Sequence, residues 1–153
     1  MISPPIEGTI LLNQILVGGA ASLANLIIHA ALLACVVWTV RRLSLSDTFA
    51  PHLLQYMLVI VCTGTLLVAD HFSEVTVWAF TYGLIGAAPP GTDLVYFAFG
   101  NYTTLGYGDI VPVAQWRLLG PMTALNGIML IGWSTALIIE ILRRSGTAPG
   151  AEA

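Results

Sequence analysis

Long runs of uncharged, apolar residues leave this chain few possible folds. These runs are Ile15–Val40, Leu53–Ala69, Val75–Ala88 and Leu118–Ile139. A helix needs about 20 apolar residues to cross the hydrocarbon core of a bilayer, so we predict three transmembrane helices, with the two middle runs in one long helix. The runs do not alternate with polar residues as the strands of a membrane barrel do. The predicted fold class is therefore an all-α membrane protein.

Few charged side chains remain to form a solvated surface. Charged residues make up 8% of the chain and hydrophobic residues 57%, whereas roughly a quarter of an average soluble domain is charged. The formal net charge of −3 argues against the basic surface that nucleic-acid binding requires. We therefore expect the lipid bilayer as a partner, no nucleic acid, and a multi-pass location in the cell membrane. Cys35 and Cys62 lie in apolar runs on different helices, and we interpret them as small hydrophobic residues.

The arginines predict the orientation in the membrane. Arg41 and Arg42 follow the first apolar run, and Arg143 and Arg144 follow the last. Three crossings bring both pairs to the same side, which the positive-inside rule identifies as cytoplasmic. The N-terminus is then expected outside and the C-terminus inside, with the segment from Gly83 to Arg117 facing outward.

A fourth apolar stretch, Leu94–Leu105, is too short to cross the bilayer. Because it lies between two spans, its length indicates a re-entrant segment that enters and leaves the membrane on the same side. Pro89, Pro90 and Gly91 in the segment Ala87–Gly91 end the preceding helix. Gly91 or Thr92 is expected to cap a short helix, with Asp93 near its positive end.

The end of this re-entrant segment carries a specific motif. Residues 104–109 read Thr-Leu-Gly-Tyr-Gly-Asp, which resembles the selectivity filter of potassium channels and differs from the commonest pattern only in Leu105, where valine is usual. The resemblance implies that backbone carbonyls replace the water around a potassium ion. The ion-binding residues that it implies are Thr104, Leu105, Gly106, Tyr107 and Gly108, with Asp109 at the outer mouth. Potassium is then a permeant ligand, no other cofactor and no catalytic residue is expected, and the protein is not expected to be an enzyme.

A row of carbonyls that point at one axis requires unusual backbone dihedrals at alternate residues. Gly106 and Gly108 permit positive φ at little steric cost. Thr104 can add its hydroxyl oxygen at the inner end, and Tyr107 can brace the loop from the side. One chain supplies one filter loop, whereas a ring of carbonyls takes four loops, so the resemblance implies a homotetramer.

The last span extends the resemblance to simple bacterial potassium channels. Residues 112–118, Pro-Val-Ala-Gln-Trp-Arg-Leu, look like the start of the inner helix in that family, and Gly127, Gly132 and the pair Thr135-Ala136 match its later pattern. The resemblance implies gating roles for the two glycines. The residues that it places at the cavity or inner gate are Ile128, Ile131 and Thr135. Close packing between helices is the alternative explanation for the glycines.

The sequence departs from the family pattern at three places. Gly100 occupies the position where many potassium channels have a carboxylate behind the filter, so that brace is missing. Tyr96 and Phe97 stand where many relatives have two tryptophans. Asn126, beside the proposed hinge, is an unusual polar residue for an inner helix. These departures bear on the rigidity of the filter and on its selectivity.

We divide the chain into three parts on this basis. Residues 1–52 form an additional N-terminal helix with a cytoplasmic loop, residues 53–144 form a pore domain, and residues 145–153 form a disordered tail. The pore domain comprises an outer helix at 53–83, a pore helix at 92–103, the filter at 104–109 and an inner helix at 116–143.

Four ionisable residues lie within the predicted spans. His29 is in the first helix, and Asp70, His71 and Glu74 share part of one face of the second. Ionisable groups inside a membrane are costly and point to function. Three interpretations remain open: a structural polar network, a proton-linked gate that senses pH, and a bound metal.

The function predicted from the sequence is potassium-selective, passive ion conduction. The alternative is a membrane metal-binding or auxiliary non-conducting subunit with His29, His71 and Glu74 as ligands, because imidazole and carboxylate groups suit a first-row metal. The sequence identifies neither an auxiliary partner nor a gating stimulus.

Overall fold

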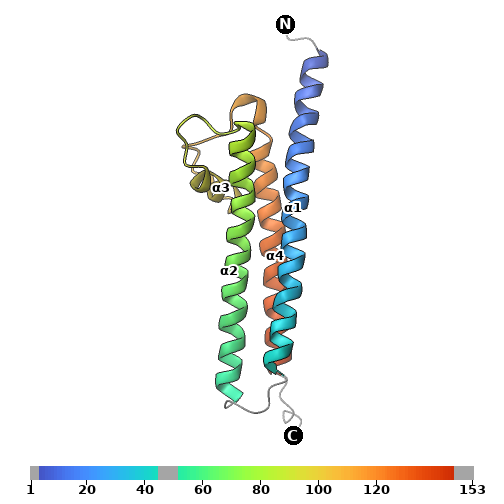
Figure 1. Ribbon diagram of the computed structural model, residues 1–153. Helices are drawn as coiled ribbons and strands as arrows, with labels where there is room; N and C mark the ends of the chain where they lie inside the picture. Colours follow the sequence, from blue (N-terminus) through green and yellow to red (C-terminus); the bar gives the residue numbers. More distant parts are fainter. Residues whose placement is uncertain (1–3, 45–51, 147–153) are drawn as a thin grey trace.

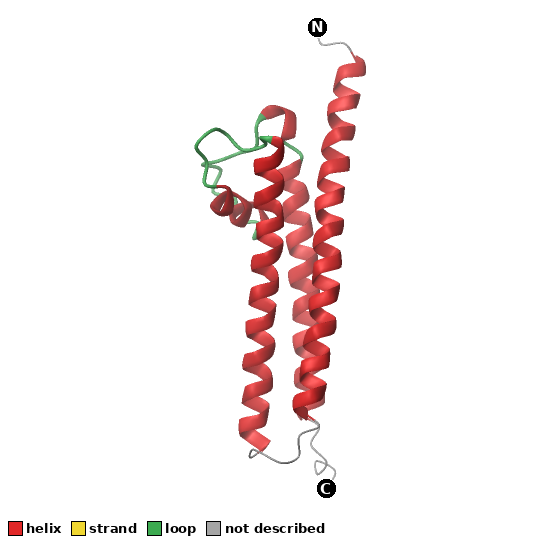
Figure 2. Cartoon of the chain, in the orientation of Figure 1, coloured by secondary structure: helices red, strands yellow, loops and turns green. Residues whose placement is uncertain are grey.

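The computed structural model describes residues 4–44 and 52–146, and within these residues the protein consists of helices and loops without strands (Figure 2). The all-α fold predicted from the sequence is confirmed. In chain order the elements are α1 (Pro4–Ser44), α2 (His52–Ile85), α3 (Leu94–Tyr102), the 3₁₀ turn η1 (Ala114–Trp116) and α4 (Leu119–Gly146).

Three long helices run side by side, and the short α3 lies beside one end of the bundle together with the connecting loops (Figure 1). The segments Gly8–Arg42, Tyr56–Ile85 and Ala114–Arg143 are long and apolar enough to cross a membrane. The prediction of three spans is therefore confirmed. The 34 residues of α2 correspond to a length of about 51 Å at the usual helical rise, which exceeds a hydrocarbon core of about 30 Å.

The caps of the helices differ in detail from the sequence-based expectation. Asp93, and not Gly91 or Thr92, is the N-cap of α3, so the expected cap is wrong. Its extended backbone (φ −68°, ψ 106°) lets the carboxylate accept hydrogen bonds from the backbone N–H groups of Val95 and Tyr96. The last long helix begins at Leu119 because residues 114–116 form a separate 3₁₀ turn.

The tail that the sequence analysis assigns to disorder, residues 145–153, lies outside the described residues except for Ser145 and Gly146. These two residues belong to the last turn of α4.

A buried aromatic core holds α3 between α2 and α4. Trp78 and Tyr82 of α2 and Tyr102 of α3 are at most 1% exposed, and the Tyr82 and Phe97 rings lie 4.8 Å apart. The Tyr82 hydroxyl is 2.6 Å from the hydroxyl of Thr123 on α4. Burial of aromatic side chains of this size is the largest source of packing stability in such a core. The position of α3 is therefore fixed by side chains from both neighbouring helices.

Helix α1 packs on α2 and α4 of its own chain. Val36 of α1 forms a second buried cluster with Val59 and Ile141 near the opposite end of the bundle. At the end that carries α3, Gln14 accepts a 2.7 Å hydrogen bond from the backbone N–H of Leu118. A Cβ atom on Gly18 would lie 2.5 Å from the sulfur of Met122, so this glycine permits close approach of α1 and α4. The additional helix is thus an integral part of the bundle.

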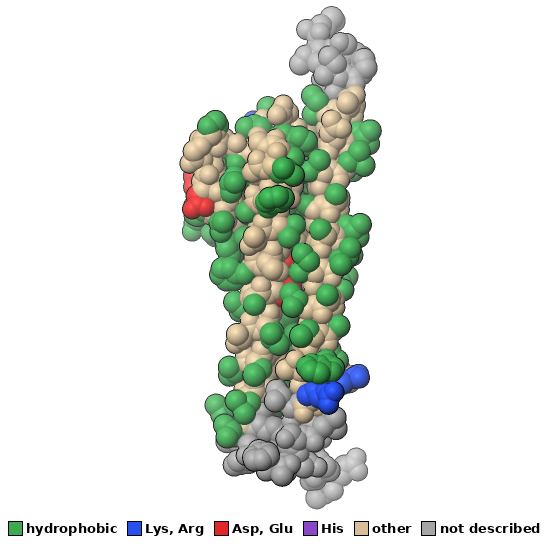
Figure 3. Space-filling view, in the orientation of Figure 1, with side chains coloured by type: hydrophobic (Ala, Val, Ile, Leu, Met, Phe, Trp, Pro, Cys, Tyr) green, Lys and Arg blue, Asp and Glu red, His purple; other side chains and the backbone are tan. Residues whose placement is uncertain are grey.

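Apolar side chains dominate the outside of the bundle, and basic side chains gather near one end (Figure 3). Large exposed side chains such as Leu16, Ile27 and Phe80 lie along the length of the helices. Such a surface is stable against lipid or against neighbouring chains and is unfavourable in water. Figure 1 places the start of α1 and the end of α4 at opposite ends of the bundle, as an odd number of crossings requires.

Candidate functional site

The short helix α3 positions the loop that follows it. Its first turn is capped by Asp93, and its inward face is held by the buried residues Phe97, Ala98 and Tyr102. The backbone N–H of Thr103 still donates to the Phe99 carbonyl at 2.9 Å. The helix therefore ends next to residues 104–109, which form the predicted filter motif. The negative end of the helix dipole therefore points toward the start of that motif.

The filter motif has alternating backbone conformations. Thr104, Gly106 and Gly108 have φ angles of 60°, 51° and 78°, and Thr104 is the only non-glycine residue with positive φ in the described part of the chain. For threonine this conformation is sterically costly, and it is held by hydrogen bonds of the Thr104 and Gly106 N–H groups to the carbonyls of Asn101 and Gly100, at 3.0 and 3.2 Å. Alternate positive φ angles are the condition for successive carbonyls to point to one side.

The outer end of the motif is tied back to α3 by a side-chain hydrogen bond. The Tyr96 hydroxyl donates to Oδ2 of Asp109 at 3.1 Å, and this bond raises the pKa of the Tyr96 hydroxyl above its usual value. Sequence reasoning treated Tyr96 only as a departure from the family pattern and missed this contact. Gly100, where a carboxylate is absent, has open space around it. The Tyr96–Asp109 bond therefore ties the end of residues 104–109 to α3 from another position.

The residues expected to face an ion path are exposed in the single chain. Leu105 and Tyr107 are 55% and 72% exposed, and Ile128 and Ile131 on α4 are 58% and 39% exposed. Thr135 is also exposed and donates a hydrogen bond to the Ile131 carbonyl at 2.9 Å. Ile128, Ile131 and Thr135 share one face of α4 by helical spacing. This face is uncovered in the single chain.

The two glycines assigned to gating have different surroundings. A Cβ atom on Gly127 would lie 2.0 Å from the carbonyl oxygen of Tyr102, whereas a Cβ atom on Gly132 would meet nothing within 4 Å. Gly127 thus lets α4 approach the backbone at the end of α3. The geometry gives this glycine a packing role, and a hinge at either glycine stays a prediction.

Asn126 connects three helices. Its Oδ1 accepts hydrogen bonds from Nδ2 of Asn25 on α1 and from the Trp78 indole nitrogen on α2, both at 2.9 Å. Asn25 also donates to the Glu74 backbone carbonyl at 3.2 Å. The unusual polar residue of the inner helix is therefore a buried junction.

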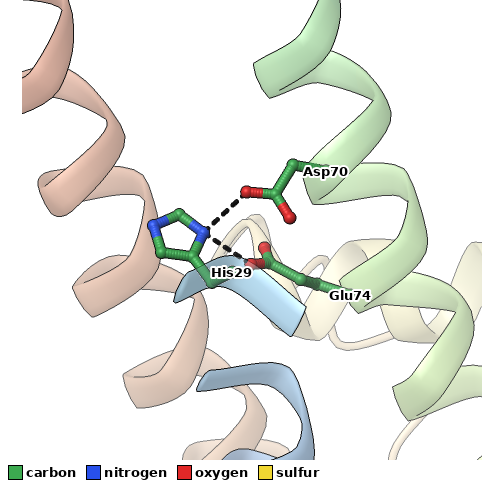
Figure 4. A group of neighbouring side chains, drawn as sticks. All are labelled: His29, Asp70 and Glu74. Carbon is green, nitrogen blue, oxygen red and sulfur yellow. Dashed lines mark hydrogen bonds and ion pairs between the residues drawn. The ribbon is translucent and has the colours of Figure 1, made fainter. Parts of the chain in front are cut away.

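Three ionisable residues of the predicted intramembrane cluster converge in the core of the bundle (Figure 4). His29, Asp70 and Glu74 are fully buried, with His29 on α1 and the two carboxylates on α2. The Nδ1 atom of His29 lies 2.7 Å from Oδ2 of Asp70 and 2.8 Å from Oε1 of Glu74. The alternative metal site groups His29 with His71 and Glu74. The rings of His29 and His71 stack with centroids 6.0 Å apart, but the polar contacts of His29 are with Asp70 and Glu74.

The cluster also contacts the last residue of α3, which precedes the predicted filter motif. Nδ1 of His71 lies 2.8 Å from Oε2 of Glu74 and 3.1 Å from the Tyr102 hydroxyl, which itself donates a hydrogen bond to the same Glu74 oxygen. Tyr102 was absent from the residues identified by sequence. The sequence places Tyr102 two residues before Thr104, at the end of the predicted pore helix. This position was the signal that could have identified Tyr102 as a functional residue.

Comparison with known proteins bears on the segment that contains the filter motif. A family model described as an ion channel matches residues 55–144, which is more than half of the chain. No curated protein and no solved structure matches the chain. The matched segment includes α3, the filter motif and nearly all of α2 and α4, whereas α1 lies outside it.

Proposed function

The chain belongs to the family of two-helix, potassium-channel-like ion channels and carries an additional N-terminal helix, and we propose that it conducts potassium selectively and passively across the cell membrane. The pore domain consists of α2, α3, the filter motif and α4. In this proposal the sequence Thr-Leu-Gly-Tyr-Gly is the selectivity filter.

The observation that carries the proposal is the alternation of positive φ at Thr104, Gly106 and Gly108. An extended strand points successive carbonyls to opposite sides, as the strands of a sheet do. Alternate residues with positive φ instead bring successive carbonyls to one side, where their oxygens can replace the hydration shell of a cation. The dipole of α3 adds negative potential at the start of this row. Both features support a filter for a dehydrated monovalent cation.

A homotetramer is part of the proposal because one chain contributes one row of carbonyls. Four rows around a common axis are needed to surround an ion, and closed symmetry supplies them from identical chains. The exposure of Leu105 and Tyr107 in the single chain supports contacts with neighbouring chains at the filter. The exposed face of α4 with Ile128, Ile131 and Thr135 is then the lining of the inner cavity.

The orientation in the membrane follows from the basic residues. Arg41 and Arg42 end α1, and Arg143 lies near the end of α4 at the same end of the bundle. The positive-inside rule makes this the cytoplasmic end. The filter mouth and the start of α1 then face outward.

The test is ion flux into liposomes that contain only the purified protein. We expect potassium uptake down its gradient and little sodium uptake in matched vesicles, with a tetramer as the main species in native mass spectrometry. Equal flux of both ions contradicts potassium selectivity. Absence of flux from an intact tetramer favours the alternative of an auxiliary, non-conducting subunit, and a monomer or dimer contradicts the proposed pore.

A further inference from the structure

Three potential metal-ligand atoms meet at one point in the buried core of the bundle. One atom each of His29, Asp70 and Glu74, all of which are fully buried, lies within 4.8 Å of the other two. Figure 4 shows the imidazole of α1 pointing between the two carboxylates of α2. The three residues come from two helices that also pack together elsewhere along their length.

The hydrogen bonds in the described part of the chain leave this cluster incompletely satisfied. Neither carboxylate oxygen of Asp70 accepts a hydrogen bond there, and its 2.7 Å approach to His29 is an ion-pair contact without hydrogen-bond geometry. The same His29 nitrogen is 2.8 Å from Glu74 and carries at most one proton. A buried carboxylate without a donor is costly. Asp70 is therefore a buried carboxylate without a hydrogen-bond donor, and a cation bound beside His29 would satisfy it.

We propose that His29, Asp70 and Glu74 bind one divalent first-row transition metal ion, with Zn²⁺ as the reference ion. Two carboxylates and a neutral imidazole carry a charge of −2, which a divalent ion neutralises in a region of low dielectric. Tetrahedral bonds of about 2.0–2.2 Å to nitrogen and oxygen place ligand atoms about 3.4 Å apart. The 2.7 and 2.8 Å separations from His29 Nδ1 to the two carboxylate oxygens are shorter than this value, so the carboxylates must rotate away from His29 when an ion enters between them.

The groups around Glu74 favour this use of its carboxylate. Its Oε2 receives a hydrogen bond from the Tyr102 hydroxyl and contacts Nδ1 of His71 at 2.8 Å. The other oxygen, Oε1, is thereby directed toward His29. Groups that hold a ligand in this way fix its orientation and raise metal affinity. The side chain of His71 is 23% exposed, so the cluster borders the surface of the single chain at this residue.

The donor atoms select the class of metal. A ligand set with one imidazole nitrogen and two carboxylates favours first-row transition ions, whereas all-oxygen sites suit Mg²⁺ and Ca²⁺. The bound ion links α1 to α2, and through the Glu74–Tyr102 hydrogen bond it also acts on the end of the helix before the filter. This effect on conduction rests on the proposed function, but binding of the ion does not.

Metal binding is measured directly on protein that is purified in detergent without a histidine tag and stripped with a chelator. Cys35 and Cys62 are replaced by serine throughout, so that thiolates do not compete for the ion. Co²⁺ serves as the spectroscopic probe, because its visible absorption reports coordination by the protein, and Zn²⁺ content after gel filtration gives the stoichiometry. We expect one ion per chain and a visible Co²⁺ spectrum that Zn²⁺ displaces but Mg²⁺ does not.

The variants separate the cluster from adventitious binding. Asp70→Asn combined with Glu74→Gln keeps the size of both side chains but removes their charge, and we expect it to lower the affinity for Zn²⁺ more than tenfold. His29→Gln removes the nitrogen ligand alone and is expected to lose the Co²⁺ spectrum. His52→Gln, at the start of α2, is the matched histidine control and is expected to retain one ion per chain.

Two results overturn the proposal. The first is wild-type protein that retains less than one tenth of a Zn²⁺ ion per chain, in which case protons and hydrogen bonds alone hold the cluster. The second is equal binding by wild type, His29→Gln and the double variant, with each fold verified by circular dichroism and gel filtration. If the variants do not fold, the wild-type stoichiometry and the Zn²⁺-dependent rise of its melting temperature decide the question. Failure of conduction in liposomes leaves these binding results unaffected, so the two proposals fail separately.

Discussion

The hydroxyl of Tyr102, the last residue of α3, donates a hydrogen bond to Oε2 of Glu74 on α2. Tyr102 is 1% exposed and Glu74 is fully buried. The bond joins the intramembrane cluster of ionisable residues to the turn from which the filter motif begins. A change in the cluster therefore reaches Thr104 through two residues of backbone.

Removal of this bond is expected to weaken both the fold and the filter. Tyr102→Phe leaves a buried carboxylate oxygen with one partner fewer, and the loss of such a bond costs about 1–3 kcal/mol. We expect a lower melting temperature together with a reduced ratio of potassium to sodium flux. Tyr56→Phe, elsewhere on α2, is the matched control and should leave both unchanged. A stable Tyr102→Phe variant with wild-type selectivity would show that the bond does not support the filter.

Substitution of Gly127 should lower stability, whereas substitution of Gly132 should not. In Gly127→Ala the new methyl group meets the Tyr102 carbonyl at 2.0 Å, and overpacking of this kind costs about 1–3 kcal/mol. Displacement of Tyr102 should also reduce selectivity. Gly132→Ala has open space around it and should fold as the wild type does. Thermal unfolding and flux ratios of both variants are the measurements.

The same pair of variants separates packing from a hinge. A hinge at Gly127 predicts altered opening with intact selectivity and intact stability in Gly127→Ala. Single-channel recordings that show this pattern would contradict the packing role. Altered opening in Gly132→Ala alone would place the flexible point at Gly132.

The bond between Tyr96 and Asp109 should stabilise the outer mouth across the neutral and mildly alkaline range. This hydrogen bond raises the pKa of the Tyr96 hydroxyl, so the protonated donor is fully present below the ordinary tyrosine pKa of about 10. The contribution is lost only as the pH rises through the higher pKa of the folded state. Tyr96→Phe should therefore reduce the selectivity of potassium flux equally at neutral and mildly alkaline pH. An effect that disappears within this range would indicate that Asp109 does not depend on this donor.

The orientation is tested by labelling introduced cysteines in a background with serine at positions 35 and 62. A membrane-impermeant maleimide should modify Ser3→Cys in intact cells but not Thr147→Cys. After the membrane is permeabilised, both should react. The reverse pattern in intact cells would contradict the outward-facing filter.

The number of spans and the positive φ angles of Gly106 and Gly108 were predictable because both are encoded locally. Apolar runs of sufficient length determine the spans, and the two glycines of Gly106-Tyr107-Gly108 mark positions that need positive φ. The positive φ of Thr104 was not predictable, because threonine disfavours this conformation and only the end of α3 enforces it. Local sequence thus indicated where the loop lies but not the whole of its backbone geometry.

Contacts between helices account for what sequence alone missed. The choice between Asp70 and His71 as the partner of His29 depends on the rotation of α2 relative to α1, which no local pattern specifies. Asn126 departs from the sequence pattern of an inner helix, and its hydrogen-bond donors, Asn25 and Trp78, come from two other helices. Long-range partners of this kind depend on packing of the whole bundle.

The most direct test of the account is the reversal potential of the purified wild-type protein in a planar bilayer with potassium on one side and sodium on the other. Gly106→Ala serves as the comparison, because a methyl group opposes the positive φ of 51° that the carbonyl row needs at this residue. The account predicts that the wild type reverses at a strongly potassium-selective potential and that selective current is lost in Gly106→Ala. A wild-type reversal potential near zero, or unchanged selectivity in Gly106→Ala, would contradict it.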